Sequence, residues 1–212
     1  MKKLQLVLLM LTAFYCNIFA YPVITQTTVI PNQQPDFKKV LVFNKFDTNL
    51  GKLIDIKIVT AGNLHTEFSI KNISAHPKTV SFWNNLDIQI TNIKTGAVIN
   101  EMLASEQKTY PAVPDKGTVS DSINSFGSNI TLYTDFTQFS NFFAVGGGVF
   151  NLSFNVEDNS MVSNGSFKVD TESQVNGSIS VIYDYEPVLV PEPSSLIMLG
   201  MLVLGIATTT KF

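Results

Sequence analysis

The chain of 212 residues contains no arginine, has a single cysteine and is only 15% charged. All 14 of its basic residues are lysines. Recognition of phosphate groups depends heavily on the bidentate guanidinium group of arginine, which this chain lacks. Residues 21–190 carry 11 lysines against 16 aspartates and glutamates, so a basic footprint is missing as well. We therefore expect no nucleic-acid partner.

The only cysteine, Cys16, lies in an apolar run near the N-terminus. A mature chain that begins after this run has neither a disulfide nor a thiol, so its stability has to come from a packed core. The sequence also lacks G-x-S-x-G and H-E-x-x-H motifs, which removes the usual minimum parts of several hydrolases and zinc sites. We expect no metal ion, no cofactor and no enzymatic activity.

The N-terminus has the layout of a secretory signal. Lys2 and Lys3 precede an apolar run that ends at Ala20, just before Tyr21. The charge orients such a segment, the apolar helix inserts, and a small residue admits the peptidase. The sequence predicts a signal peptide over residues 1–20, cut by signal peptidase between Ala20 and Tyr21. An uncleaved signal anchor and a lipid on Cys16 are the alternatives.

The C-terminal segment, residues 188–212, combines a short motif with an apolar run. Pro191, Glu192 and Pro193 are followed by an uncharged stretch at 196–207 and by Lys211 near the end. A permanent membrane helix needs about 20 apolar residues, so a hydrophobic helix here is marginal as an anchor. A motif, a short apolar tail and a terminal positive charge are typical of tails that processing removes. A simple C-terminal membrane anchor is the alternative.

This tail resembles the PEP-CTERM sorting signal of Gram-negative bacteria, with Pro191, Glu192 and Pro193 as its motif. The resemblance implies tethering in the inner membrane, recognition by an exosortase (a membrane cysteine transpeptidase) and delivery to the cell surface or exopolysaccharide matrix. The family usually ends in a cluster of arginine or lysine, whereas this chain has only Lys211.

Apolar and polar residues alternate with a period of two through the middle of the chain, the pattern of strands with one buried face. Turns rich in Asn, Gly and Asp separate these segments. The sequence predicts an antiparallel β-sandwich of about nine short strands over residues 21–187, flanked by the signal peptide and the hydrophobic tail helix. The expected strands cover Thr27–Ile30, Lys39–Phe43, Ile54–Ile58, Leu64–Ile70, Lys78–Trp83, Leu86–Ile90, Phe150–Val156, Ser166–Val169 and Ile179–Tyr185.

Two stretches lack this alternation. Residues 95–129 contain two prolines, Pro111 and Pro114, and several Gly, Ser and Asp residues, which predicts a long surface excursion. A short helix is expected around Asp135–Phe143.

The segment from Phe46 to Leu53 resembles the opening motif of the choice-of-anchor E domain, a β-rich family found upstream of PEP-CTERM and similar anchors. The resemblance implies a β fold and a surface location, and the family has no established catalytic residues. Physically, Asp47–Gly51 is expected to form a tight turn with Phe46 and Leu53 packed inward.

Few side chains in the sequence are candidates for catalysis or for binding a metal ion or phosphate. His65 and His76 are expected to be solvated surface histidines. Glu157–Asn159 offers oxygen atoms to calcium but lacks the spacing of a calcium loop, so a solvated hairpin turn is the stronger prediction. Gly146–Gly148 precedes a strand rather than a helix, which predicts a flexible turn and not a phosphate loop.

Aromatic residues provide the remaining candidate site. Trp83, next to Phe82, and the Phe136–Phe143 cluster offer faces on which a sugar can stack, although packing in the core explains most such phenylalanines. The sequence as a whole predicts an exported, non-enzymatic surface or matrix protein. An anchored carbohydrate-binding or adhesive module that uses Trp83 is the alternative, with exopolysaccharide as its candidate partner. An exported hydrolase, the third hypothesis, lacks a recognisable nucleophile–base pair.

Overall fold

All regular structure in the described part of the chain is β. The computed structural model describes residues 21–137, 139–163 and 165–188. These residues form antiparallel sheets and contain no helix, so the prediction of an all-β antiparallel fold is confirmed. The predicted signal peptide and the tail from residue 189 onward lie outside the described residues.

The strands are of very unequal length, from two residues to 22. In chain order they are β1 (Val23–Gln33), β2 (Phe37–Asn44), β3 (Phe46–Asp47), β4 (Gly51–Asn72), β5 (Lys78–Asn92), β6 (Val98–Val113), β7 (Thr118–Tyr133), β8 (Phe143–Ala144), β9 (Val149–Asp158), β10 (Met161–Val162) and β11 (Phe167–Pro187).

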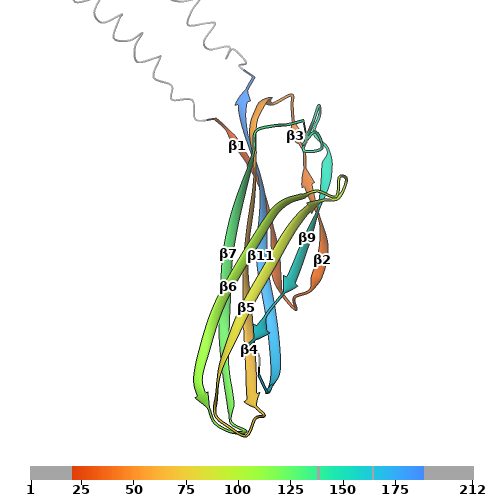
Figure 1. The fold of residues 1–212 in the computed structure, drawn as a ribbon. Coiled ribbons are helices and arrows are strands. Elements are labelled where there is room, and N and C mark those ends of the chain that lie inside the picture. Colours follow the sequence, from red (N-terminus) through yellow and green to blue (C-terminus); the bar gives the residue numbers. More distant parts are fainter. Residues whose placement is uncertain (1–20, 138, 164, 189–212) are drawn as a thin grey trace, which may run out of the picture.

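Two antiparallel sheets pack against each other. The first has the strand order β1-β11-β4-β7. In the second, β5 is central: it pairs with β6 along one side and with β9 and β10 along the other, and β9 also pairs with β2. The two-residue strands β3 and β8 pair in parallel beside them. The molecule is long and narrow, with β2, β3 and β9 widening one end (Figure 1).

The strands are longer than predicted because the alternation keeps its phase across the expected gaps. Segments Ile54–Ile58 and Leu64–Ile70 are both part of β4, in which the even-numbered residues from Ile56 to Asn72 are all buried. Thr60 and Gly62 occupy inward positions between them. Because these inward residues are polar or small, the apolar alternation is interrupted and one strand was predicted as two. The same interruption occurs in β5 and β11.

A buried polar layer divides the core into two clusters. The larger lies in the wider half, and the smaller contains Phe68, Phe82 and neighbouring residues toward the narrow end. Between them the fully buried Asn84 accepts a 2.7 Å hydrogen bond from the Thr66 hydroxyl and donates one of 3.0 Å to the Leu64 carbonyl. The Ser125 hydroxyl donates to the Asn84 carbonyl. Since buried polar groups need partners, this layer fixes the alignment of the two sheets.

Three glycines lie side by side on the inner face of the first sheet. Gly177 of β11 pairs with Gly62 of β4, which pairs in turn with Gly127 of β7. A Cβ at Gly127 would come within 2.4 Å of the Met102 sulfur, and one at Gly177 within 2.8 Å of the Ala61 carbonyl oxygen. The absence of side chains in this row lets the second sheet approach closely.

The prediction of a long excursion over residues 95–129 is wrong. Most of this stretch forms β6 and the greater part of β7, two strands of 16 residues each, joined by a turn at residues 114–117. Apolar alternation is absent because polar residues of β7, the exposed Asp121 and Asn129 and the buried Ser125, bond to partners on β5 and β6. The helix expected around Asp135–Phe143 is wrong too, since its described residues form turns leading into β8.

Both boundaries of the domain lie at the same end of the molecule. The Tyr185 amide donates to the Pro22 carbonyl, and the Val188 amide donates to the Leu50 carbonyl. At the opposite end the Asn72 amide donates to the Gly117 carbonyl, which joins the β4–β5 and β6–β7 turns. The 22 residues of β4 run between the two ends, a length of roughly 70 Å at about 3.3 Å per residue. We call these the terminal end and the distal end (Figure 1).

Candidate functional site

The turn predicted over Asp47–Gly51 is present at the terminal end. The Leu50 amide donates to the Asp47 carbonyl at 3.0 Å, and Phe46 and Leu53 are buried as predicted. An Asp47 carboxylate oxygen accepts from the amides of Asn49 and Gly146, both at 2.9 Å. Asp47 therefore links this turn to the loop between β8 and β9.

That second loop contains the three glycines predicted to form a turn. Gly146, Gly147 and Gly148 all have positive φ, between 75° and 113°, a backbone conformation that only glycine adopts readily. The Gly147 amide donates to the Ala144 carbonyl, which closes a turn that leads directly into β9. The prediction of a glycine turn is confirmed.

Tyr21 and Val188, the first and last described residues, lie at this end of the domain. Tyr21, on the C-terminal side of the predicted signal-peptide cut, is exposed, and Ala20 lies outside the described residues. The motif residues Pro191, Glu192 and Pro193 lie outside them as well. The described chain ends at Val188, three residues before the motif, where β11 has just finished.

Trp83 lies half-exposed on the outer face of the second sheet, the face turned away from the first. Its register partners are Gln107 of β6 and Met161 of β10, and Met161 is itself exposed. Phe82, one position earlier, points the other way and is buried against Phe68 with ring centroids 4.3 Å apart. Only the tryptophan of this pair is therefore accessible to a ligand.

The Phe136–Phe143 cluster belongs mainly to the core. Phe139 and Phe142 are buried, and Phe142 packs on Phe150 with centroids 4.4 Å apart. Phe136 and Phe143 are partly buried and meet edge to face. The cluster closes the wide end of the sandwich and offers no open aromatic platform, so core packing accounts for it.

Three carboxylates meet on the outer face beyond Trp83. Asp87 of β5 pairs in register with Glu157 of β9, and Glu101 of β6 lies one row away. Burial raises the pKa of Asp87 above the ordinary value for aspartate, and the negative charges of Glu101 and Glu157 raise it further. One Asp87 oxygen is buried without a hydrogen-bond partner in the structure. No sequence signal pointed to this group, because its members come from three strands that only the sheet register brings together.

The stretch Glu157–Asn159, the weak calcium candidate, ends β9 and turns toward β10. The Asp158 amide donates to Asp36, and the Asn159 amide donates to the Asn85 carbonyl. Residues 21–137, 139–163 and 165–188 contain no group of three or more His, Cys, Asp or Glu side chains arranged to hold a metal ion.

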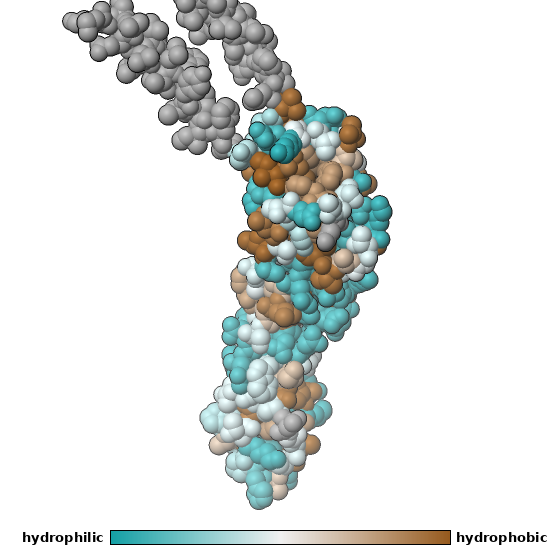
Figure 2. Space-filling model, turned by 45° about the horizontal axis from the view of Figure 1, so that its top comes forward, coloured by the Kyte–Doolittle hydropathy of each residue, from teal (hydrophilic) through white to brown (hydrophobic). Residues whose placement is uncertain are grey.

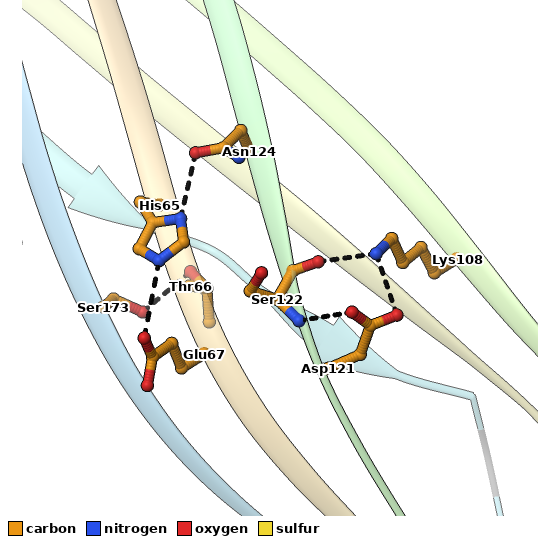
Figure 3. A network of polar contacts seen from close by, with 8 residues as sticks. All are labelled: His65, Thr66, Glu67, Lys108, Asp121, Ser122, Asn124 and Ser173. Atoms are coloured by element: carbon orange, nitrogen blue, oxygen red, sulfur yellow. Dashed lines mark hydrogen bonds and ion pairs between the residues drawn. The ribbon is translucent and has the colours of Figure 1, made fainter.

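The two histidines occupy separate positions on the first sheet and its distal turn. His65 lies on the outer face, with its Nδ1 3.0 Å from the Asn124 side-chain oxygen and its Nε2 3.8 Å from a Glu67 oxygen (Figure 3). His76 is exposed in the β4–β5 turn, where its carbonyl accepts from Asn72 and Ser74. Both are surface residues, as predicted.

Side-chain bonds close the seam between β6 and β7, which share no backbone ladder. The Lys108 ammonium lies 2.8 Å from Asp121 and 2.6 Å from the Ser122 carbonyl oxygen (Figure 3). The Tyr110 hydroxyl donates to the same Asp121 oxygen. These donors and the Ser122 amide hold the pKa of Asp121 well below its usual value. Farther along, Asn129 donates to the Glu101 carbonyl. Side-chain hydrogen bonds and the Lys108–Asp121 ion pair thus hold the two strands together.

A second charge group lies on the outer face of the first sheet, toward the terminal end. The Lys57 ammonium bonds Asp184 of β11 and lies 3.6 Å from Asp55. Burial raises the pKa of Asp55, and the neighbouring Asp184 carboxylate raises it further, while Lys57 opposes the shift. The group ties β4 to β11 close to the point where the tail leaves the domain.

The outer face of the first sheet is open and shallow. A depression of about 690 Å³ lies across β7, β4 and β11, and Glu67, Ser69, Ser122, Asp170 and Glu172 are among the residues lining it. Its lining is polar and acidic, unlike the mostly apolar enclosed clefts that bind small molecules. No helix in the described ranges reaches the length and apolarity needed to cross a bilayer.

Comparisons with known proteins show no family. No protein-family model and no curated protein matches the chain. Among solved structures, it is similar to a CocE/NonD family hydrolase from Staphylococcus aureus (10% identity, TM-score 0.24, 76% of this chain and 37% of that one). It is also similar to the tailspike protein of Acinetobacter baumannii phage AM24 (11%, 0.20, 79% and 27%).

A family 11 carbohydrate-binding module from Clostridium thermocellum is similar at 10% identity and a TM-score of 0.16, over 79% of this chain and 91% of that one. The chain spans only about a third of the length of the first two structures. Similarities this weak carry no argument about function.

Proposed function

We propose that this chain is an exported, non-enzymatic protein of the cell surface or exopolysaccharide matrix of a Gram-negative bacterium. Its β-sandwich is flanked by an N-terminal signal peptide and a C-terminal hydrophobic helix. The tail tethers it in the inner membrane until an exosortase acts at Pro191, Glu192 and Pro193. The domain is then displayed at the surface or released into the matrix.

One observation supports this proposal above the others. β1 begins and β11 ends at the same end of a domain about 70 Å long, by the rise of about 3.3 Å per residue along β4. A tail that leaves from this end allows the distal end to project away from the membrane. Since β11 stops at Pro187, only three residues separate the folded domain from the motif. The motif thus follows the last strand of the domain closely in the sequence.

Cell fractionation tests the proposal. In cells that possess an exosortase, the parent protein is expected in the surface or matrix fraction. A variant with Pro191→Ala, Glu192→Ala and Pro193→Ala is expected to stay in the inner membrane. A matched control, Ser194→Ala with Ser195→Ala, alters the same linker outside the motif and should fractionate like the parent. Equal distribution of the parent and the motif variant would contradict the proposal.

The alternative, a carbohydrate-binding module, is favoured by one observation: the half-exposed Trp83 between Gln107 and Met161. An indole face flanked by one amide and one thioether side chain is able to stack on the C–H surface of a sugar ring. Binding of the domain to the host's own polysaccharide tests this, with Trp83→Ala expected to abolish it. Leu103→Ala, on the same outer face, is the matched control because Leu103 is also exposed. Undiminished binding by the Trp83 variant would dismiss this site.

A further inference from the structure

The terminal end of the domain exposes apolar side chains on loops rather than on sheet faces. Leu50 is 46% exposed in the turn before β4, and Val145 is 80% exposed in the loop after β8. Val188 and Tyr21, at the two boundaries of the domain, are 59% and 55% exposed. In the view of Figure 2, hydrophobic surface gathers in the wider part of the molecule, including this end.

Hydrogen bonds hold these four residues at one end. The Val188 amide donates to the Leu50 carbonyl, so these two are neighbours. The amide of Gly146, next to Val145, donates to Asp47 in the turn that carries Leu50. Pro22, which follows Tyr21, accepts from Tyr185. The apolar side chains thus project from backbone that is fixed by pairing, which removes much of the entropic cost of ordering a contact surface.

The distal end differs. Of the described residues in its turns at 73–77, 114–117 and 163–166, Ile73 alone is a large exposed apolar side chain. Asp115, Lys116 and His76 are among its exposed polar residues. Scattered apolar residues are normal on a protein surface, but concentration on the loop tips of one end calls for a partner at that end.

The proposed insertion of the tail makes a bilayer the partner nearest to this end. The apolar run of the tail begins at Leu196, eight residues after Val188. Eight residues span at most about 28 Å when fully extended, so a tail inserted in a membrane keeps the terminal end within that distance of the lipid. Two positive and two negative side chains, Lys45, Lys52, Asp47 and Glu186, flank these apolar residues in the chain.

We propose that Leu50, Val145, Val188 and Tyr21 form a membrane-contacting surface that rests on the bilayer while the tail is in place. This inference depends on the proposed function, because the tail has to enter the membrane. Shallow insertion of the four side chains removes apolar surface from water. It holds residues 191–193 at the membrane surface, where a membrane transpeptidase works, and points the distal end outward.

Fluorescence quenching in vesicles tests this surface without any exosortase. Residues 21–212, the chain left after the proposed signal-peptide cut, contain no cysteine, so Val145→Cys places a single fluorescent label at the terminal end. Ile73→Cys in the same background places the matched label on the exposed distal turn. Both proteins, each spanning residues 21–212, are reconstituted into phosphatidylcholine vesicles that contain a lipid-bound quencher. The label at position 145 is expected to be strongly quenched and the label at 73 to be unaffected.

Substitutions at the other contact residues supply a second readout. Leu50→Ser with Val188→Ser removes two half-exposed apolar groups, so the equilibrium constant for docking should fall by about tenfold or more. Ile73→Ser should leave quenching at 145 unchanged. Because the contact is apolar, 0.5 M salt (about a 4 Å screening length) should leave it unchanged too.

Three outcomes would overturn the proposal. Equal quenching at the two positions would mean that the domain has no preferred contact with the bilayer. Self-quenching between labels at 145, without lipid quenching, would make a second copy of the chain the occupant. If the chain does not bind to the vesicles at all, the tail does not insert, and both proposals depend on that insertion. Docking in vesicles together with unchanged sorting by the motif variant in cells would instead defeat the proposed function alone.

Discussion

Replacing Gly62 with alanine is expected to destabilise the domain, mainly because the new methyl group would clash with the Ile88 side chain. A Cβ at this position would lie 2.4 Å from the Ile88 Cδ1 and 3.0 Å from the Met102 Cε, both shorter than normal contacts. Overpacking of this kind costs about 1–3 kcal/mol. Alanine also restricts the unfolded chain, which recovers about 0.4–1 kcal/mol. The free energy of unfolding should therefore fall by up to about 2.6 kcal/mol.

A second substitution isolates the cause. Ile88→Val deletes the Cδ1 that the new methyl group would meet, and alone it should cost about 0.5–1.5 kcal/mol. If the clash is responsible, the double variant Gly62→Ala with Ile88→Val should lose less free energy of unfolding than the sum of the two single losses, by about 1 kcal/mol. Ile70→Val, in the other core cluster, is the matched control and should combine additively with Gly62→Ala.

Urea unfolding of the four proteins in the cycle measures these values. Agreement of the double variant with the sum, within about 0.3–0.5 kcal/mol, would refute the reasoning, because independent sites add within that range. It would mean that the second sheet does not approach the glycine row as closely as the structure has it.

Three further substitutions test the polar interior and the charged faces. Asn84→Ala leaves buried groups without partners, so the free energy of unfolding should fall by roughly 1–3 kcal/mol in urea titrations, and an unchanged value would contradict the role of the polar layer. Asp87→Asn should raise the melting temperature at pH 7: a raised folded-state pKa means that stability is lost as the pH rises through it, so this gain should shrink as the pH falls. Asp121→Asn should do the opposite, lowering the melting temperature at pH 7, with the difference closing below pH of about 4, because a lowered pKa gives stability that is present above the unfolded-state value. Melting curves of the parent and both variants at several pH values test the two pKa shifts. A difference in melting temperature that does not change with pH would contradict the shift assigned to that aspartate.

Sequence reasoning located the strands whose inward positions are apolar. The alternation in β9 and at the end of β11 was sufficient because residues such as Phe154, Val181 and Tyr183 occupy successive inward positions. It also placed Phe46 and Leu53 in the core on either side of the Asp47–Gly51 turn, since the sharp change of direction and the apolar flanks are local features.

β6 and β7 were not predicted because they break the usual pattern of apolar residues facing inward and polar residues facing outward. Phe126, Ile130 and Leu132 of β7 are exposed, while Ser125 is buried. The buried hydroxyl is stabilised by a partner on β5 that is 41 residues away in the sequence. Such long-range pairing leaves no local pattern, and the proline-containing stretch resembled a loop for the same reason.

The neighbours of the surface groups could not be predicted from the sequence. Trp83 was chosen for its residue type alone, and the structure adds that Gln107 and Met161 flank it. The apolar loops at the terminal end come from four separate parts of the chain. Their common location depends on the pairing of β11 with both β1 and β4, which no segment encodes by itself.

The intact mass of the protein recovered from the cell surface and medium tests the central claim most directly. The parent is expected to lack both residues 1–20 and the apolar tail, whereas the variant with alanine at positions 191–193 should keep the tail. The second protein acts as a mass standard for incomplete processing in the same cells. A parent mass that still includes residues 194–212 would contradict exosortase sorting and leave the tail as a simple anchor.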